Sequence, residues 1–229
     1  MRTPLRVEFG GLTVLTSPPN SQGFALLDAL AAVRDNPIGD PTGVGLGQLL
    51  QAFQRGNEIR DTILADPRFG TDEASAPPAT PPGGRTTGDT VGIAAADGDG
   101  YAVSLIQSVY YAFGSGLIDP PATGVLFHNR GCGFSLDVTS PNVIAPRKRP
   151  AHTLMPVLTV RDGHVAHVLS TMGGQGQPQI LGQILLHALS GASAIDAVAA
   201  PRAIIGNQIG GGADSVTVEA DVSAAALDS

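Results

Sequence analysis

The stretch that decides the fold runs Gly88-Asp-Thr-Val-Gly-Ile-Ala-Ala-Ala-Asp-Gly-Asp-Gly-Tyr-Ala-Val-Ser-Leu-Ile-Gln-Ser108 and continues to Gly116. Two apolar runs, 91–96 and 101–109, flank Asp97-Gly-Asp-Gly100, whose aspartates and glycines suit the positive φ angles of a tight reversal. This pattern predicts a β-hairpin. Its first strand opens at Thr90, directly after a segment rich in Ala, Pro, Thr and Gly.

The composition limits the classes of function. The chain has 229 residues, of which 42% are hydrophobic, so it can bury a core in one domain or a closely joined pair. A formal net charge of −7 argues against nucleic acid or an anionic membrane as a partner. Cys132 is the single cysteine, which excludes an intrachain disulfide and a cysteine-rich zinc site. We expect no metal and no cofactor, and, because no signal peptide is visible, a cytoplasmic location.

The remaining elements show apolar residues at the spacing of a strand or a helix. Asn20 or Ser21 is expected to cap the first helix. Hairpins covered by helices predict an α+β domain, arranged as an α/β/β/α sandwich. Strands are expected at 6–9, 13–16, 124–128, 155–160, 164–170 and 216–218, and helices at 24–33, 46–64, 180–189 and 194–199.

Few side chains suggest chemistry by themselves. Gly173-Gly174 lies between a strand and a helix, where backbone N–H groups can converge on an oxyanion, but a tight strand-to-helix turn is the simpler explanation. Thr90 at a strand start is explained by β propensity. His164 and His167 are three apart on one strand and therefore on opposite faces, so they are not a metal pair.

Taken in order, the motifs of the chain resemble the gamma-glutamyltransferase family of N-terminal nucleophile hydrolases, and more closely its acylase and amidohydrolase branch. The resemblance covers most of the chain and implies the α/β/β/α sandwich of those hydrolases. It also implies an incomplete sandwich, because the family has a long amino-terminal portion ahead of these motifs and further strands after them. The motifs are Pro18-Pro-Asn-Ser21, Asp66-Pro-Arg-Phe69, Gly88-Asp-Thr-Val91, Ala102-Val-Ser-Leu-Ile-Gln-Ser108, Phe113-Gly-Ser-Gly116, Pro141-Asn-Val143, Lys148-Arg-Pro150 with His152-Thr153, and Met172-Gly-Gly174 with Gln177-Pro-Gln179.

The resemblance implies that the chain cuts itself between Asp89 and Thr90. Residues 1–89, with a flexible linker at 71–89, then correspond to the end of the large subunit, and 90–229 to a shortened catalytic small subunit. The implied activity is that of a threonine amidohydrolase or acyltransferase, which cleaves a small amide through an acyl-enzyme on Thr90. The α-amine freed by the cut can act as the base for the Thr90 hydroxyl.

Further roles follow from the same resemblance. Ser108 occupies the position of a hydroxyl residue beside the nucleophile, and the N–H groups of Gly173 and Gly174 form the oxyanion hole. His152 and Thr153 lie where glutamyl-specific members carry two serines that hold the substrate carboxylate. Arg130 is placed with them among the substrate-binding residues.

The chain also departs from the glutamyl-specific pattern. Asp89-Thr90-Val91 replaces a threonine-threonine-histidine signature, and Gly133 stands where an acidic residue binds the glutamyl α-amine. An amide other than a γ-glutamyl amide is therefore expected as the substrate. The alternative is an inactive fragment or non-catalytic remnant that requires the missing amino-terminal segment. The expected partner is either that segment or a second copy of the chain.

Overall fold

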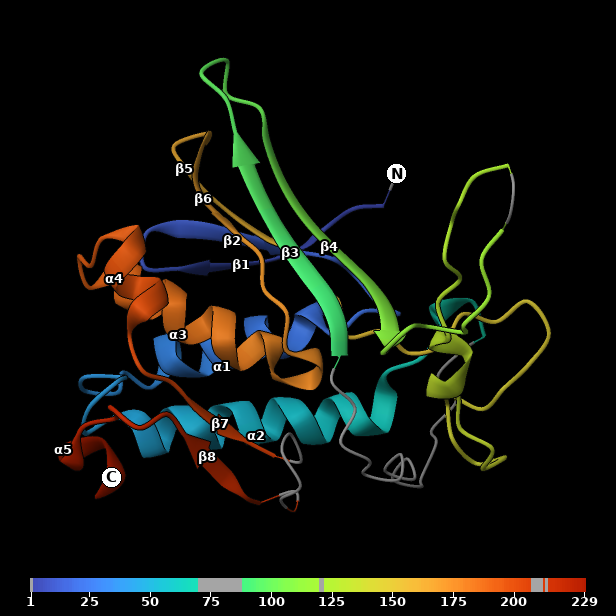
Figure 1. Cartoon of the computed structure of the whole chain (residues 1–229). Helices are drawn as coiled ribbons and strands as arrows, with labels where there is room; N and C mark the ends of the chain where they lie inside the picture. The colour runs from blue at the N-terminus through green and yellow to red at the C-terminus, as the bar shows by residue number, and fades with distance from the viewer. Residues whose placement is uncertain (1, 70–87, 120–121, 207–211, 213) are drawn as a thin grey trace.

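The computed structural model describes residues 2–69, 88–119, 122–206, 212 and 214–229 (Figure 1). The expected linker at 71–89 lies outside the described residues up to position 87. None of the helices within these ranges has the length and apolarity that crossing a membrane requires.

One antiparallel sheet contains strands from both ends of the sequence. Its order is β1-β2-β5-β6, and β2 pairs with β5 so that Thr16 lies opposite Val157. The expected hairpins at 6–9/13–16 and 155–160/164–170 are thereby confirmed. Asp162 and Gly163 both have positive φ, as an Asp-Gly hairpin turn requires. The bounds are β1 (Leu5–Phe9), β2 (Leu12–Thr16), β5 (Val157–Arg161) and β6 (His164–Leu169).

The hairpin predicted around Asp97-Gly-Asp-Gly100 is formed by β3 (Gly88–Ala96) and β4 (Ala102–Tyr111). It lies across the end of β6 (Figure 1), where Ser104 Oγ donates to Leu169 O at 2.6 Å and Ser170 Oγ donates to Leu105 O at 2.9 Å. Only glycine fits at position 92, because a Cβ there would lie 2.7 Å from Thr171 N. The hairpin therefore forms a second β layer held close to the sheet.

Two helices, α1 (Gly23–Asp35) and α3 (Gln177–Leu189), pack against the sheet, and α2 (Leu46–Ile63) packs against α1 (Figure 1). These helices confirm the predictions for 24–33, 46–64 and 180–189. The core between sheet and helices consists of apolar side chains that are at most 8% exposed: Leu12, Val14, Leu26, Leu27, Leu30, Met155, Val157, Leu169, Leu181 and Leu185.

Short elements complete the described chain. The expected helix at 194–199 and strand at 216–218 are confirmed. The strand β7 was not predicted. The side-chain amides of Gln179 and Gln183 on α3 supply part of its hydrogen bonding, through Ile205 and Ala203. The short elements are η1 (Pro67–Phe69), η2 (Arg130–Gly133), η3 (Gly174–Gly176), α4 (Ala194–Ala199), β7 (Ala203–Ile205), β8 (Val216–Val218) and α5 (Ala224–Leu227).

Two expectations are wrong. The segment 124–128 is not a strand, because it turns back on residues 117–119 within one loop and forms only the isolated bridge Ile118–Leu126. The first helix is capped neither by Asn20 nor by Ser21, since its N-cap residue is Gln22, without a side-chain capping bond. The side chains of Asn20 and Ser21 instead donate to Pro150 O and Leu154 O.

The outer face of the β3–β4 hairpin is apolar and open. Val91, Ile93, Val103 and Leu105 lie on this face and are 45–56% exposed. The described residues thus supply a hairpin layer, a sheet layer and a helical layer, which confirms the α+β class. Of the expected α/β/β/α sandwich, the helical layer outside the hairpin is absent from the described part of the chain.

This exposure predicts an unequal response to truncation of two leucines. Leu26→Ala in the core should lower the free energy of unfolding by about 2–5 kcal/mol, whereas Leu105→Ala on the open face should lower it by about 1 kcal/mol or less. Urea unfolding of both variants measures the difference. An equal loss for Leu105→Ala would show that another surface covers this face in solution.

Candidate active site

Thr90 and Ser108 face each other across the β3–β4 ladder. The Thr90 hydroxyl donates to Ser108 Oγ at 2.9 Å, and Ser108 Oγ also accepts the backbone N–H of Tyr110 at 2.9 Å. The register of the ladder shifts between Gly88 and Thr90, so the Asp89–Thr90 peptide lies at a bulge. A hydroxyl with a fixed orientation therefore follows directly after an irregular, strand-end peptide bond.

Arg130 lies beside this pair and is only 8% exposed. Its guanidinium carbon is 4.1 Å from the ring centroid of Tyr110, and its Nε donates to Ala151 O at 3.0 Å, with Nη2 bonded to the same oxygen. Burial lowers the pKa of Arg130 and raises the pKa of Tyr110 to about 12. Tyr110 is therefore a neutral phenol at neutral pH, and Arg130 stays a cation because an arginine in a protein keeps its proton even where burial lowers its pKa.

His152 is held neutral. Burial, and then the positive charge of Arg130, lower the pKa of its imidazole to about 4. Its Nδ1 accepts the N–H of Leu154 at 3.2 Å, so the proton of the neutral ring is on Nε2. His152 therefore offers an uncharged donor.

The glycine pair adopts backbone angles that favour glycine. Gly173 has φ 122° and Gly174 has φ 53°, and a Cβ on Gly173 would lie 2.6 Å from Ile180 Cδ1. Gly173 is the N-cap of η3, which begins at Gly174 and leads into α3, so the peptide groups of the pair lie near a helix amino end. This geometry is compatible with an oxyanion site. It is equally compatible with the tight strand-to-helix turn.

Gln22 connects two parts of the site and was missed by the sequence analysis. Its side chain is fully buried, and its Nε2 donates to Thr153 O at 2.7 Å and to Gly174 O at 2.8 Å. Gln177, at the start of α3, accepts the N–H of Met155 at 3.1 Å. The segment carrying Thr153 is thus tied to the glycine turn. The sequence shows Gln22 only as a polar residue between the Pro-Pro-Asn-Ser motif and an apolar helix. This position does not indicate which residues its side chain contacts.

Asp66 holds together two chain segments near the site. Its carboxylate is fully buried and accepts bonds from Arg68 Nη2 at 2.6 Å and Arg149 Nη2 at 2.8 Å. The hydrogen bonds from Arg149, and then those from Arg68, hold the pKa of Asp66 far below its usual range. Arg68 also donates to Arg147 O at 2.8 Å. The residues before the expected linker are therefore fixed to the basic loop that leads to His152.

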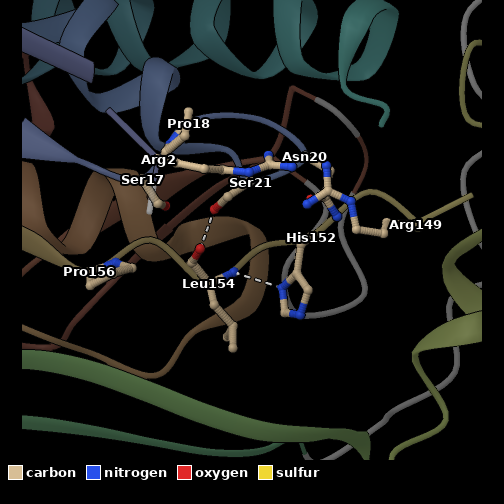
Figure 2. A pocket seen from close by; sticks show the side chains of 9 residues that line it. All are labelled: Arg2, Ser17, Pro18, Asn20, Ser21, Arg149, His152, Leu154 and Pro156. Carbon is tan, nitrogen blue, oxygen red and sulfur yellow. Dashed lines mark hydrogen bonds between the residues drawn. The ribbon is translucent and has the colours of Figure 1, made fainter. Parts of the chain in front are cut away.

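Two cavities meet at His152. The larger, of about 390 Å³, is open, and Figure 2 shows the His152 ring among its lining residues, bonded to Leu154. The smaller, of about 20 Å³, lies toward the hairpin. The larger is lined by Arg2, Ser17, Pro18, Asn20, Ser21, Arg149, His152, Leu154 and Pro156, and the smaller by Ser108, Tyr110, His128, Arg130, His152, Thr153 and Leu154.

The structure thus brings several of the expected site residues together. Ser108, Arg130, His152 and Thr153 line one cavity. Thr90 joins it through Ser108, and Gly174 is linked to Thr153 through Gln22. The side chain of Asp89 lies outside what the structure describes.

Other candidate groups have no assigned role in this site. His167 Nδ1 bonds Thr159 Oγ1 at 2.7 Å, while His164 is exposed at the strand end. The Cys132 thiol is exposed. Within the described ranges, no three His, Cys, Asp or Glu side chains are grouped so that they could hold a metal ion.

Residues 71–229 match the family model described as gamma-glutamyltranspeptidase. The chain is 35% identical to the glutathione hydrolase-like YwrD proenzyme of Bacillus subtilis (strain 168), covering 94% of this chain and 45% of that protein. It is 33% identical to the oxamate amidohydrolase proenzyme of Klebsiella pneumoniae, covering 94% and 44%. The chain therefore spans less than half the length of these relatives.

The fold has a close counterpart among solved structures. Cephalosporin acylase from Bacillus halodurans superposes with a TM-score of 0.80 at 27% identity, over 98% of this chain and 44% of that one. The fold is that of an N-terminal nucleophile hydrolase, present in part. The chain belongs to the gamma-glutamyltranspeptidase family.

The Asp66 cluster predicts a pH-dependent loss in Asp66→Asn. Since the pKa of Asp66 is depressed on folding, its ionised form stabilises the fold above the ordinary aspartate pKa, and this contribution declines as the pH falls below that value. Because both arginines reach solvent, the variant should lose about 1–3 kcal/mol of unfolding free energy at neutral pH. Urea unfolding at pH 7 and at about pH 3 measures it. A difference between wild type and variant that grows toward acid would contradict this account.

Proposed function

We propose that this chain carries the catalytic centre of a self-processing threonine amidohydrolase or acyltransferase, which cuts its own Asp89–Thr90 bond and then cleaves a small amide. The observation that carries the proposal is the Thr90 hydroxyl, which lies at a strand-end bulge and is oriented by Ser108 at 2.9 Å. Family membership supports it, because the relatives named above are described as proenzymes. The cut divides the chain into 1–89 and 90–229.

The first reaction is an internal acyl transfer. Thr90 Oγ attacks the carbonyl carbon of Asp89, the peptide C–N bond breaks, and the nitrogen takes a proton to become the α-amine of Thr90. An ester now joins Asp89 to Thr90 Oγ. Water hydrolyses this ester, leaving a carboxylate on Asp89 and a free amino-terminal threonine.

The second reaction uses the new terminus. The α-amine of Thr90 takes the hydroxyl proton as Oγ attacks the amide carbonyl of the substrate, and that proton passes to the leaving nitrogen when the C–N bond breaks. Water then hydrolyses the acyl ester on Thr90, or an amine takes the acyl group. We assign the N–H groups of Gly173 and Gly174 to the developing oxyanion. Donors of this kind are worth about 3–4 kcal/mol of transition-state stabilisation.

A partner segment is part of the proposal. The open apolar face of the hairpin and the open cavity at His152 both suit a covering polypeptide, and the relatives are more than twice as long as the matched region. We propose that a further segment of the family fold covers both. The same observations favour the second candidate, a non-catalytic remnant that folds stably only with such a segment.

The names of the relatives supply the first substrates to try. Oxamate and glutathione are the amides that those names contain. Gly133 offers no carboxylate for an α-ammonium group, so we expect oxamate to be turned over faster than glutathione. Release of ammonia from oxamate and of glutamate from glutathione measures the two activities.

Self-cleavage depends on the Thr90 hydroxyl. Folded wild-type chain should yield two fragments with a new amino terminus at Thr90, Thr90→Ser should still cut, and Thr90→Ala should remain one polypeptide because it has no nucleophile. Thr13→Ala, which removes a hydroxyl that bonds Glu8 far from the site, is the matched control and should cut normally. Intact-mass spectrometry and amino-terminal sequencing record the products.

Two results would count against the proposal. A wild-type chain that unfolds cooperatively yet stays intact, alone and after co-expression with an upstream segment of a longer relative, contradicts self-processing. Cutting that continues in Thr90→Ala contradicts the assignment of the nucleophile.

The bridge made by Gln22 predicts a loss of turnover that exceeds the loss of stability. Gln22→Met keeps the side-chain length but removes both donors, so the glycine turn and the Thr153 segment can shift relative to each other. We expect kcat for amide cleavage to fall about 10- to 100-fold with little change in KM.

Gln183→Met provides the matched control. Gln183 is equally buried and bonds Gln179 and Ala203, away from the site. This control should lose unfolding free energy of about 1–3 kcal/mol and keep kcat within about threefold. Equal losses of kcat in the two variants would show that Gln22 has a structural role and no specific effect on turnover.

A further inference from the structure

Arg130 is a buried cation that has no anionic partner among the residues that the structure describes. Its side chain is 8% exposed, and no carboxylate in the described ranges lies within 4.0 Å of its guanidinium. Buried charges in proteins are ordinarily paired, because an unpaired charge loses its hydration without compensation. Among the arginines that the structure describes, Arg60 has a comparable burial, and it is paired with Asp61 at 2.8 Å. Arg130 is the exception that calls for a ligand.

The hydrogen bonds of Arg130 are incomplete as well. A guanidinium has five N–H donors in a planar fork. Nε and Nη2 both donate to one acceptor, Ala151 O, and the face of the group stacks on Tyr110. These contacts fix the plane of the guanidinium. In the described structure, no hydrogen bond is made by Nη1. The N–H groups of this nitrogen can therefore donate to a ligand, and the planar geometry of a guanidinium suits a carboxylate.

The surroundings of Arg130 favour an anion. The small cavity beside it is lined by side chains that donate hydrogen bonds or are apolar, and none of them is acidic. His152 is neutral and carries its ring proton on Nε2, while Ser108, Tyr110 and Thr153 contribute hydroxyl groups. A positively charged substrate group would be repelled by Arg130, and a neutral group would leave its charge unpaired.

The cavity also lies next to the proposed nucleophile. Ser108 lines it and accepts the hydrogen bond of Thr90 at 2.9 Å. Its volume of about 20 Å³ has room for about one water-sized group. A small anionic end, close to the carbonyl that Thr90 attacks, therefore fits better than a long or bulky one.

We propose that Arg130 binds the carboxylate of the acyl part of the substrate, so that the substrates are short amides carrying a carboxylate near the scissile bond. This inference rests on the proposed function for its reaction, but not for the binding itself. Arg130 then selects substrates whose acyl group carries a negative charge.

Matched pairs of ligands test the proposal. Oxamate and oxamide have nearly the same size, but oxamate carries a carboxylate where oxamide carries a neutral carboxamide. Succinamate and succinamide differ in the same way. Their binding to the full chain can be followed through the Nε–H signal of Arg130 in an arginine-labelled sample, with Arg130→Lys to assign the signal. We expect the anionic member of at least one pair to shift this signal saturably and to bind at least about tenfold more tightly than its neutral partner.

Variants separate recognition from folding. Arg130→Met should abolish the preference for the anion and leave the weak affinity for the neutral amide within about threefold. Arg202→Met, which removes a cation paired with Glu219 outside the cavity, should keep the preference. Where the chain turns over amides, the ratio of kcat/KM for the anionic and neutral members should fall in the same way in Arg130→Met.

The outcomes are distinguishable from those for the proposed function. Equal binding of both members of each pair, or binding that leaves the Arg130 signal unmoved, overturns the inference even if the chain cuts itself. Preferential binding of the anion by a chain that never cuts itself supports the inference and contradicts self-processing. If Arg130→Met fails to fold, the comparison of paired ligands on the wild-type chain still decides.

Discussion

The antiparallel pairing of β2 with β5 joins residues that precede the proposed cut to residues that follow it. The shared core draws Leu12, Val14 and Leu26 from one side of that bond and Val157, Leu181 and Leu185 from the other. The two parts therefore cannot separate without unpairing a central strand and exposing the core. This constraint makes an internal cut compatible with a stable fold, because cleavage at the head of β3 leaves the sheet intact.

The same interlocking assembles the site. Gln22 and Asp66 come from the first part, and their partners Thr153, Gly174 and Arg149 come from the second. Both bonds of Gln22 end on backbone carbonyl groups, so they fix the course of the chain rather than the identity of the facing side chain, and Asp66 likewise accepts the backbone N–H of Arg149. The proposed nucleophilic hydroxyl of Thr90, the glycine turn and the cavity beside Arg130 are thereby positioned by elements on which the fold itself depends. Arg130, which has no anionic partner within the described part of the chain, lines the cavity where these elements meet.

The structural elements that could be predicted from the sequence were those whose interacting residues lie nearby in the chain. The Asp97-Gly-Asp-Gly100 turn sets the register of its hairpin, so that Ala96 pairs with Ala102 and, further out, Thr90 with Ser108. The position of Thr90 as a candidate followed from the resemblance and not from its strand. Helix faces and the Asp-Gly turn at 162–163 were equally local signals.

The missed features depend on distant partners. Gln22 bonds residues 131 and 152 positions away, and the basic loop at 147–149 is organised by Asp66, 83 positions before Arg149. β7 is completed by glutamine side chains of a helix, which no strand pattern reveals. The segment 124–128 has a strand's composition but folds back on its own loop.

The most direct measurement is the mass of the folded wild-type chain, taken before and after denaturation. We predict fragments 1–89 and 90–229 that elute together under native conditions and separate only in denaturant. A single polypeptide of full mass, folded and unchanged with time in the presence of its completing segment, would contradict it.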